Sequence, residues 1–196
     1  MDCEYILIKG KPGTGKSHTV KVVIEESLEE DYTVCYATPT GIVTSSYRSQ
    51  FVEESFYCDT IHVMFKYPVA KEDKPMVNWE LGQFNVLIID KLSMVPEKIF
   101  RQFHVRPVVL LCGDQQQQQP IATVEGKTWQ TQGILNNKEF YKQCVVVDFL
   151  KQHRCRDTYS KTTLTTYVIV NRADRFLGNF LKIALYAKKQ SLTKCK

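Results

Sequence analysis

An α/β domain with a mainly parallel sheet flanked by helices is the fold class that this sequence predicts, and three observations support it. Short apolar segments of strand length alternate along the chain with more polar segments that suit helices. Most of the apolar segments are continuous rather than alternating, as in strands that are buried on both faces of a sheet. The length of 196 residues and the hydrophobic content of 43% suit one compact domain with a sizeable core.

Five segments have the length and the β-branched content of strands. They cover residues 4–9, 32–37, 84–90, 106–114 and 144–150. Between the first two, a predicted helix has its apolar residues on one face. These residues are Val20, Val23, Ile24 and Leu28. A second helix is expected to begin with Ser93 as its cap and Pro96 in its first turn. The β-α-β order favours a parallel sheet, whose ligands are expected at the carboxyl ends of the strands.

The composition limits the location and the partners of the protein. The net charge of +5 and the isoelectric point near 8.7 suit a polyanionic partner, but a bias of this size does not identify one. The seven cysteines form no CxxC pair, so the sequence predicts neither a zinc site nor a disulfide framework. No signal peptide or membrane-spanning apolar run is present, so no membrane association is expected. We expect an intracellular protein, nuclear or mitochondrial, or cytoplasmic if it is viral.

The segment GKPGTGKS at residues 10–17 matches the pattern G-x-x-x-x-G-K-[ST] in full and lies between a predicted strand and a predicted helix. Glycines in this pattern let backbone N–H groups point at phosphate oxygens, and the helix N-terminus adds partial positive charge. Lys16 would reach the β- and γ-phosphates of ATP, and Ser17 would ligate Mg²⁺. The alternative is a glycine-rich turn that only joins a strand to a helix. The expected nucleotide-binding residues are Gly10, Lys11, Pro12, Gly13, Thr14, Gly15, Lys16, Ser17 and His18.

A second magnesium ligand is expected at the end of a buried strand, and Asp90 closes the apolar segment VLIID. The alternative for Asp90 is a strand-end aspartate that caps the next helix. Many P-loop hydrolases have a glutamate directly after this aspartate, where it positions or deprotonates the attacking water. The residue here is Lys91, which is protonated at neutral pH and cannot act as that base.

The segment LLCGDQQQQQP at residues 110–120 repeats the design of a buried strand that ends in polar residues. A glutamine at this edge of the sheet could contact the γ-phosphate and report its presence. The alternative is that the five glutamines form a solvated low-complexity tract.

Six segments occur in an order and spacing that resemble a superfamily 1 DNA helicase of the PIF/RecD-like, 5′-to-3′ branch. They are GKPGTGKS (10–17), ATPTGIVTS (37–45), DTIHVMF (59–65), IIDKLSMV (88–95), GDQQQQQP (113–120) and LKQHRCRD (150–157). The resemblance covers residues 4–160 and implies a RecA-like P-loop NTPase domain, similar to helicase domain 1A, over residues 1–157. Residues 158–196 would be a helical, basic C-terminal extension or the truncated start of a second domain.

The resemblance also implies roles for individual residues. Lys16, Asp90, Gln117 and Arg154 would be catalytic, with Gln117 and Arg154 approaching the γ-phosphate. Gln118 and Gln119 depart from the leucine and proline that are usual in the family. Single-stranded DNA would contact Pro39, Thr40, Gly41, Thr60 and His62. The structural alternatives there are a Pro-Gly turn and a partly buried histidine. Three aromatic residues near these segments are interpreted as core residues, namely Tyr47, Phe51 and Phe65.

The resemblance thus implies the motor domain of an ATP-dependent DNA helicase, from a family that acts in DNA repair and recombination. Hydrolysis should be slow, because Lys91 replaces the catalytic glutamate at a cost of about 10²- to 10⁴-fold. The second RecA-like domain, with its arginine finger, would have to come from a longer protein or a partner, so we expect a fragment or a degenerate copy. Two alternatives remain: a non-enzymatic nucleotide- or DNA-binding remnant, and a small-molecule kinase with a P-loop.

Overall fold

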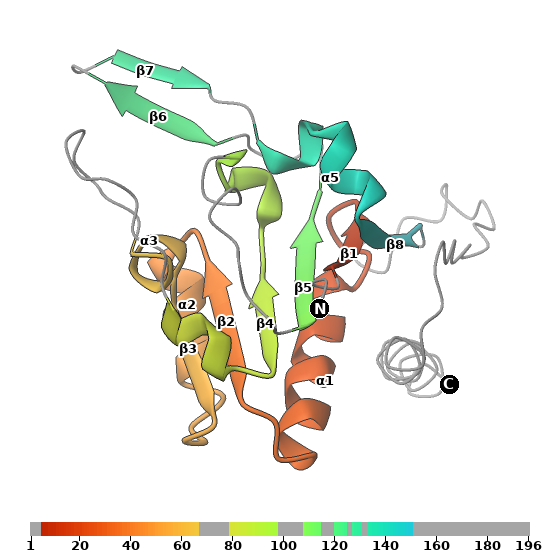
Figure 1. The fold of residues 1–196 in the computed structure, drawn as a ribbon, viewed down its shortest axis with the longest axis vertical. Coiled ribbons are helices and arrows are strands. Elements are labelled where there is room, and N and C mark those ends of the chain that lie inside the picture. Colours follow the sequence, from red (N-terminus) through yellow and green to blue (C-terminus); the bar gives the residue numbers. More distant parts are fainter. Residues whose placement is uncertain are drawn as a thin grey trace.

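The computed structural model describes residues 5–66, 79–97, 108–114, 120–124, 127–130 and 133–150. Six strands form one sheet in the order β3-β2-β4-β5-β1-β8, and every pair of neighbours in it is parallel (Figure 1). Their bounds are Tyr5–Gly10 (β1), Val34–Thr38 (β2), Phe56–Thr60 (β3), Val86–Ile89 (β4), Val108–Gly113 (β5) and Cys144–Phe149 (β8). The predicted α/β class with a parallel sheet is confirmed.

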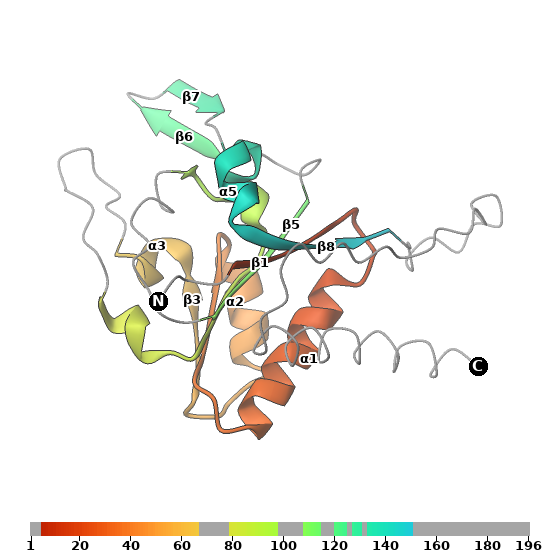
Figure 2. The ribbon, with the colours of Figure 1, turned by 45° about the vertical axis from the view of Figure 1, so that its right-hand side comes forward.

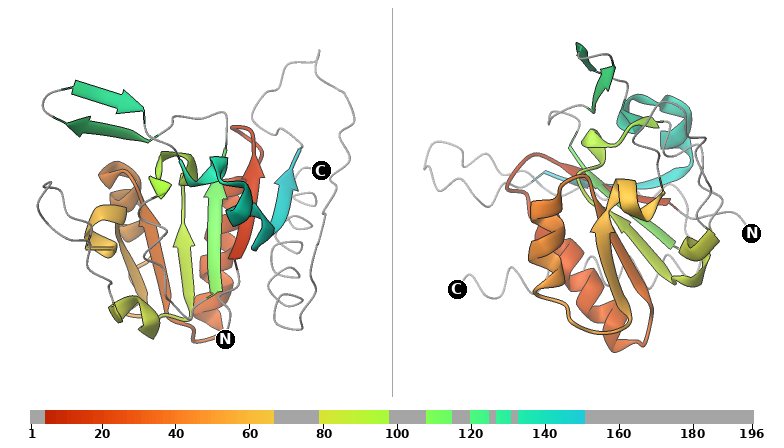
Figure 3. Two further views of the ribbon diagram at one scale, coloured as in Figure 1. Left: turned by 45° about the horizontal axis from the view of Figure 1, so that its top comes forward. Right: turned by 90° about the vertical axis from the view of Figure 1, so that its left-hand side faces the viewer.

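Helices cover both faces of the sheet (Figures 2 and 3). Helices α1 (Lys16–Glu29) and α2 (Gly41–Arg48) lie on one face. Helices α3 (Ile61–Met64) and α5 (Lys138–Lys142) lie on the other. The 3₁₀ turns are η1 (Trp79–Gln83), η2 (Leu92–Met94) and η3 (Ile134–Asn136). A hairpin of β6 (Ile121–Val124) and β7 (Lys127–Gln130) forms a separate antiparallel pair.

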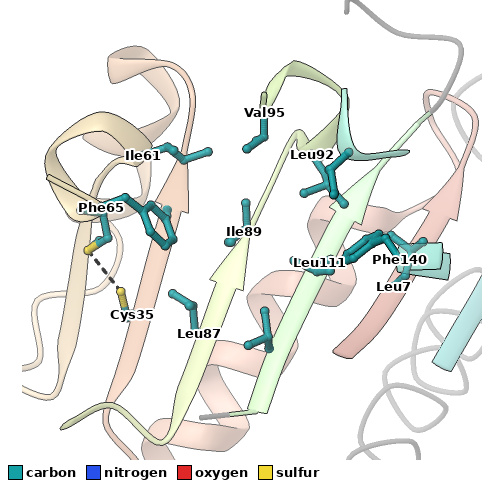
Figure 4. Close-up of a cluster of buried hydrophobic side chains, with 14 of the residues drawn as sticks. Leu7, Cys35, Ile61, Phe65, Leu87, Ile89, Leu92, Val95, Leu111 and Phe140 are labelled. Atoms are coloured by element: carbon teal, nitrogen blue, oxygen red, sulfur yellow. Dashed lines mark hydrogen bonds between the residues drawn. The ribbon is translucent and has the colours of Figure 1, made fainter. Parts of the chain in front are cut away.

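Two buried clusters hold these layers together. In β1, Ile6 and Ile8 face α1, whereas Leu7 between them faces α5. Figure 4 shows the second cluster, in which residues of β4 and β5 pack under α3, η2 and α5. Burying a side chain of this size contributes about 1.5–3 kcal/mol to the free energy of unfolding, so the continuous apolar strands are the main source of stability.

The structure differs from the sequence prediction at two places. The second predicted helix does not begin at Ser93, because Ser93 lies inside η2 and Pro96 forms an antiparallel bridge with Gly133. Helical geometry is assigned at Glu97, and the rest of that predicted helix lies outside the described residues. The sequence interpretation also did not include β3. No helix in the described part of the chain is long and apolar enough to span a membrane.

Candidate nucleotide-binding site and nucleic-acid edge

The loop between β1 and α1 has a backbone that glycine makes possible. Gly13 and Gly15 have φ angles of 80° and 98°, a region that other residues rarely adopt. A Cβ atom on Gly10 would lie only 2.6 Å from the carbonyl oxygen of Phe149 in β8. Gly15 precedes α1 without a side-chain cap, so the first amides of that helix are not taken up by a capping side chain. The predicted phosphate-binding loop therefore has a matching backbone.

Lys16 is half-buried at the start of α1, and its side chain turns back over the loop. Its ammonium group donates hydrogen bonds to the carbonyl oxygens of Gly10 (2.5 Å) and Lys11 (2.9 Å). Burial lowers the pKa of Lys16, and the nearby carboxylates of Asp114 and Asp90 oppose this effect. The loop after β1 and the ends of β4 and β5 therefore converge on one place.

Asp90 follows β4 directly and is only 7% exposed. Its Oδ2 atom accepts a hydrogen bond from the Tyr36 hydroxyl (3.0 Å), and its Oδ1 atom accepts one from the Lys91 backbone N–H (2.8 Å). Burial raises the pKa of Asp90, while these two donors and the positive charges of Lys91 and Lys16 oppose the rise. The carboxylate is thus held from two sides at the carboxyl end of the sheet.

Lys91, at the position of the expected glutamate, has a left-handed backbone with φ 55° and ψ 45°. This conformation costs a non-glycine residue roughly 1–2 kcal/mol. Its backbone N–H donates a hydrogen bond to Asp90. Lys91 is half-buried, and its ammonium group forms no ion pair with any residue that the structure describes. A cation therefore occupies the place beside the candidate metal ligand.

The resemblance implies residues near the γ-phosphate, at the end of β5 and beyond β8. Asp114 follows β5 and is buried close to Lys16. Gln117 and Arg154 lie outside the described residues. Of the expected nucleotide-binding residues, Lys11, Pro12, Ser17 and His18 are exposed. Thr14 is buried and donates a hydrogen bond from its hydroxyl to the carbonyl of Lys11 (2.9 Å).

The candidate DNA-contacting segments lie side by side. Thr38 pairs with Thr60 in the parallel register of β2 and β3, so the residues after both strands share one edge of the sheet. Pro39, Thr40 and Thr60 are half-buried there, and Gly41 and His62 are exposed. The Thr38 and Thr40 hydroxyls are buried and have no hydrogen-bond partner among the described residues. Tyr47, Phe51 and Phe65 are buried, which confirms their interpretation as core residues.

Two tyrosines near Asp90 were not found from the sequence. Tyr36 lies in β2 and Tyr47 in α2. Tyr47 was interpreted as a core residue, and Tyr36 was not singled out. No spacing signal distinguishes a buried tyrosine whose hydroxyl reaches a carboxylate from one that only fills space. The contacts of their hydroxyl groups with Asp90 and with the Ser17 carbonyl depend on how the fold arranges β2, β4 and α1.

The model of the AAA domain family matches residues 1–123 of the sequence, which is more than half of its length. The chain belongs to the AAA domain family. None of the curated proteins matches the sequence.

Solved structures of Pif1 helicases share the fold of this AAA domain. The structure of two coordinating Pif1 helicases on forked double-stranded DNA has a TM-score of 0.57 and 20% identity over 80% of this chain and 42% of that chain. Bacteroides Pif1 bound to single-stranded DNA has a TM-score of 0.54 and 18% identity over 79% and 40% of the two chains. Bacteroides sp Pif1 with ADP-AlF4 has a TM-score of 0.54 and 20% identity over 78% of this chain and 39% of that chain.

These comparisons agree with the resemblance that the six sequence segments indicate. The domain has a RecA-like P-loop fold, and this fold is similar to that of the Pif1 helicases. The chain spans about two fifths of the length of the Pif1 chains that it matches.

Proposed function

We propose that the chain is the nucleotide-binding RecA-like domain of an ATP-dependent DNA helicase. It binds Mg-ATP at residues 10–17 and single-stranded DNA at the edge formed by residues 39–41 and 60–62. The observation that carries this proposal is that the glycine loop with Lys16 and the carboxylate of Asp90 follow strands of one parallel sheet, in which only β5 separates β1 from β4. The Pif1 structures with ADP-AlF4, single-stranded DNA and forked DNA support the same assignment.

The residues present fit a magnesium ion. Mg²⁺ at nucleotide sites usually takes one or two protein oxygens together with phosphates and water. The Ser17 side chain is exposed, and its hydroxyl makes no hydrogen bond within the described part of the chain. Asp90 supplies a carboxylate at the neighbouring strand end. When bound, the ion would neutralise charge on the β- and γ-phosphates. Lys16 would contribute a further positive charge there.

Hydrolysis by this site is expected to be slow. Lys91 directly follows Asp90, and its ammonium cannot accept a proton from the attacking water. The second RecA-like domain, with its arginine finger, is proposed to come from the rest of a longer protein or from a partner chain. Binding of ATP and binding of DNA are therefore better tests of this domain than its rate of ATP hydrolysis.

Titration with a fluorescent ATP analogue in Mg²⁺ and with a labelled single-stranded oligonucleotide tests the proposal. We expect saturable binding of both probes. Absence of nucleotide binding would contradict the motor assignment, and absence of both would support the remnant alternative. The small-molecule kinase alternative gives no role to residues 39–41 and 60–62, and DNA binding there would exclude it.

A further inference from the structure

A buried tyrosine reaches the candidate metal ligand from the next strand. Tyr36 in β2 is paired in register with Ile88 in β4, and its side chain is fully buried. Its hydroxyl lies 3.0 Å from Oδ2 of Asp90 and donates to it. Hydrogen bonds to an ionised acceptor are stronger than neutral ones, so this contact fixes one side of the carboxylate. The Lys91 N–H fixes the other side at Oδ1.

A second tyrosine connects Tyr36 to the phosphate-binding helix. The rings of Tyr36 and Tyr47 are stacked with centroids 4.1 Å apart and planes 15° apart. Tyr47 comes from α2, is 4% exposed, and donates a hydrogen bond from its hydroxyl to the Ser17 carbonyl oxygen (3.4 Å). The Lys21 ammonium of α1 lies 5.7 Å from the centroid of the same ring. A continuous buried path thus runs from Asp90 to the first turn of α1.

Packing alone does not explain why residues 36 and 47 are tyrosines rather than phenylalanines. Phenylalanine would keep the stacked rings and the buried area. A buried hydroxyl without a partner costs roughly 1–3 kcal/mol, so tyrosine is favoured only where its oxygen has a partner.

We propose that Tyr36 is a positioning residue that orients the Asp90 carboxylate for Mg²⁺, and that Tyr47 fixes Tyr36 against the phosphate-binding helix. The pair ties the metal ligand at the end of β4 to the loop that holds the phosphates. This inference rests on the proposed function, because it assigns to Asp90 the role of metal ligand. Groups that orient metal ligands usually affect metal affinity about 10- to 100-fold.

A magnesium titration with a fluorescent ATP analogue at fixed concentration tests this role. For Tyr36→Phe we expect the Mg²⁺ midpoint to rise about tenfold or more, while the affinity for the analogue in EDTA stays within about twofold of the wild type. For Tyr47→Phe the bond between Tyr36 and Asp90 remains, so the midpoint should rise less. Tyr57→Phe is the matched control, because Tyr57 is 48% exposed on β3 and stacks on Phe84.

The outcomes separate the two proposals. A Mg²⁺ midpoint for Tyr36→Phe within twofold of the wild type would overturn the positioning role. An equal loss of affinity in EDTA would also overturn it, because general damage to the fold would explain that result. If the wild type itself takes up no analogue in Mg²⁺, the proposed function fails, and the role of the tyrosines fails with it.

Discussion

The phosphate-binding loop and the edge formed by residues 39–41 and 60–62 belong to the same sheet but are built in different ways. The loop depends on backbone geometry, with glycines at positive φ and one lysine that folds over them. The edge depends on side chains after β2 and β3, including the exposed apolar residues Ile42 (87%) and Val63 (56%). We infer that single residues control nucleotide binding, whereas any DNA contact is shared by several residues of similar weight.

The largest expected effect concerns Lys91. Restoring a general base by Lys91→Glu should raise ATP hydrolysis by about 10²-fold or more, with further stimulation by single-stranded DNA. Lys91→Gln is the matched control, because it removes the charge without adding a base. Steady-state phosphate release measures both. Equal rates for the two variants would show that the charge, rather than the missing base, limits the reaction.

The next effect concerns the phosphate-binding loop itself. Lys16→Ala removes the cation that lies over the loop and should weaken binding of a fluorescent ATP analogue by about 10²-fold, since hydrogen bonds to charged groups contribute about 1.5–3 kcal/mol each. Lys142→Ala is the control, because its ammonium pairs with Glu139 on the exposed side of α5. Similar losses in both variants would contradict a specific phosphate contact.

Most of the fold could be predicted from two signals in the sequence, the continuous apolar segments and the glycine pattern. The strands β1, β2, β4, β5 and β8, the helix α1 and the glycine loop follow from such patterns. Edge strand β3 was missed because its apolar run, Phe56–Cys58, is short and is followed by the polar residues Asp59 and Thr60. Ser93 was interpreted as a helix cap because serine before a proline is a common helix start, but β5 and η3 pack against this turn.

The site was predictable to a similar degree. Asp90 could be found because it closes an apolar strand, and the distances between strands then follow from the sheet order. Tyr36 could not be found, because its role depends on where β4 places Asp90. The left-handed backbone of Lys91 could not be predicted either, because glycine is the usual residue for such a conformation.

A third prediction concerns the two outer strands of the sheet at alkaline pH. Burial raises the pKa of Cys58 in β3 to about 11 and that of Cys144 in β8 to about 12, from an ordinary value of 9.0. The folded state therefore holds these protons more tightly, and the free energy of unfolding should fall as the pH rises from 9 towards 12. Thermal unfolding at pH 8 and pH 10.5 measures this.

Alanine variants assign the pH effect to each edge of the sheet. Cys58→Ala and Cys144→Ala should each reduce the difference in midpoint temperature between the two pH values, although both lower stability at pH 8. The two variants should have similar effects, because pH 10.5 lies below both raised pKa values. An unchanged difference in both variants would show that other groups cause the alkaline loss.

The smallest effects are expected at the edge formed by residues 39–41 and 60–62, the proposed site of DNA binding. Ile42→Ser and Val63→Ser remove exposed apolar side chains beside Gly41 and His62, and each should weaken binding of a single-stranded oligonucleotide about two- to fivefold. Val52→Ser is the matched control, because Val52 is 83% exposed but precedes β3, at the other end of that strand.

Because Ile42 and Val63 lie on different helices, their effects should add in the double variant. A loss in either single variant as large as that of Lys16→Ala on nucleotide binding would show that the edge, like the loop, depends on one residue.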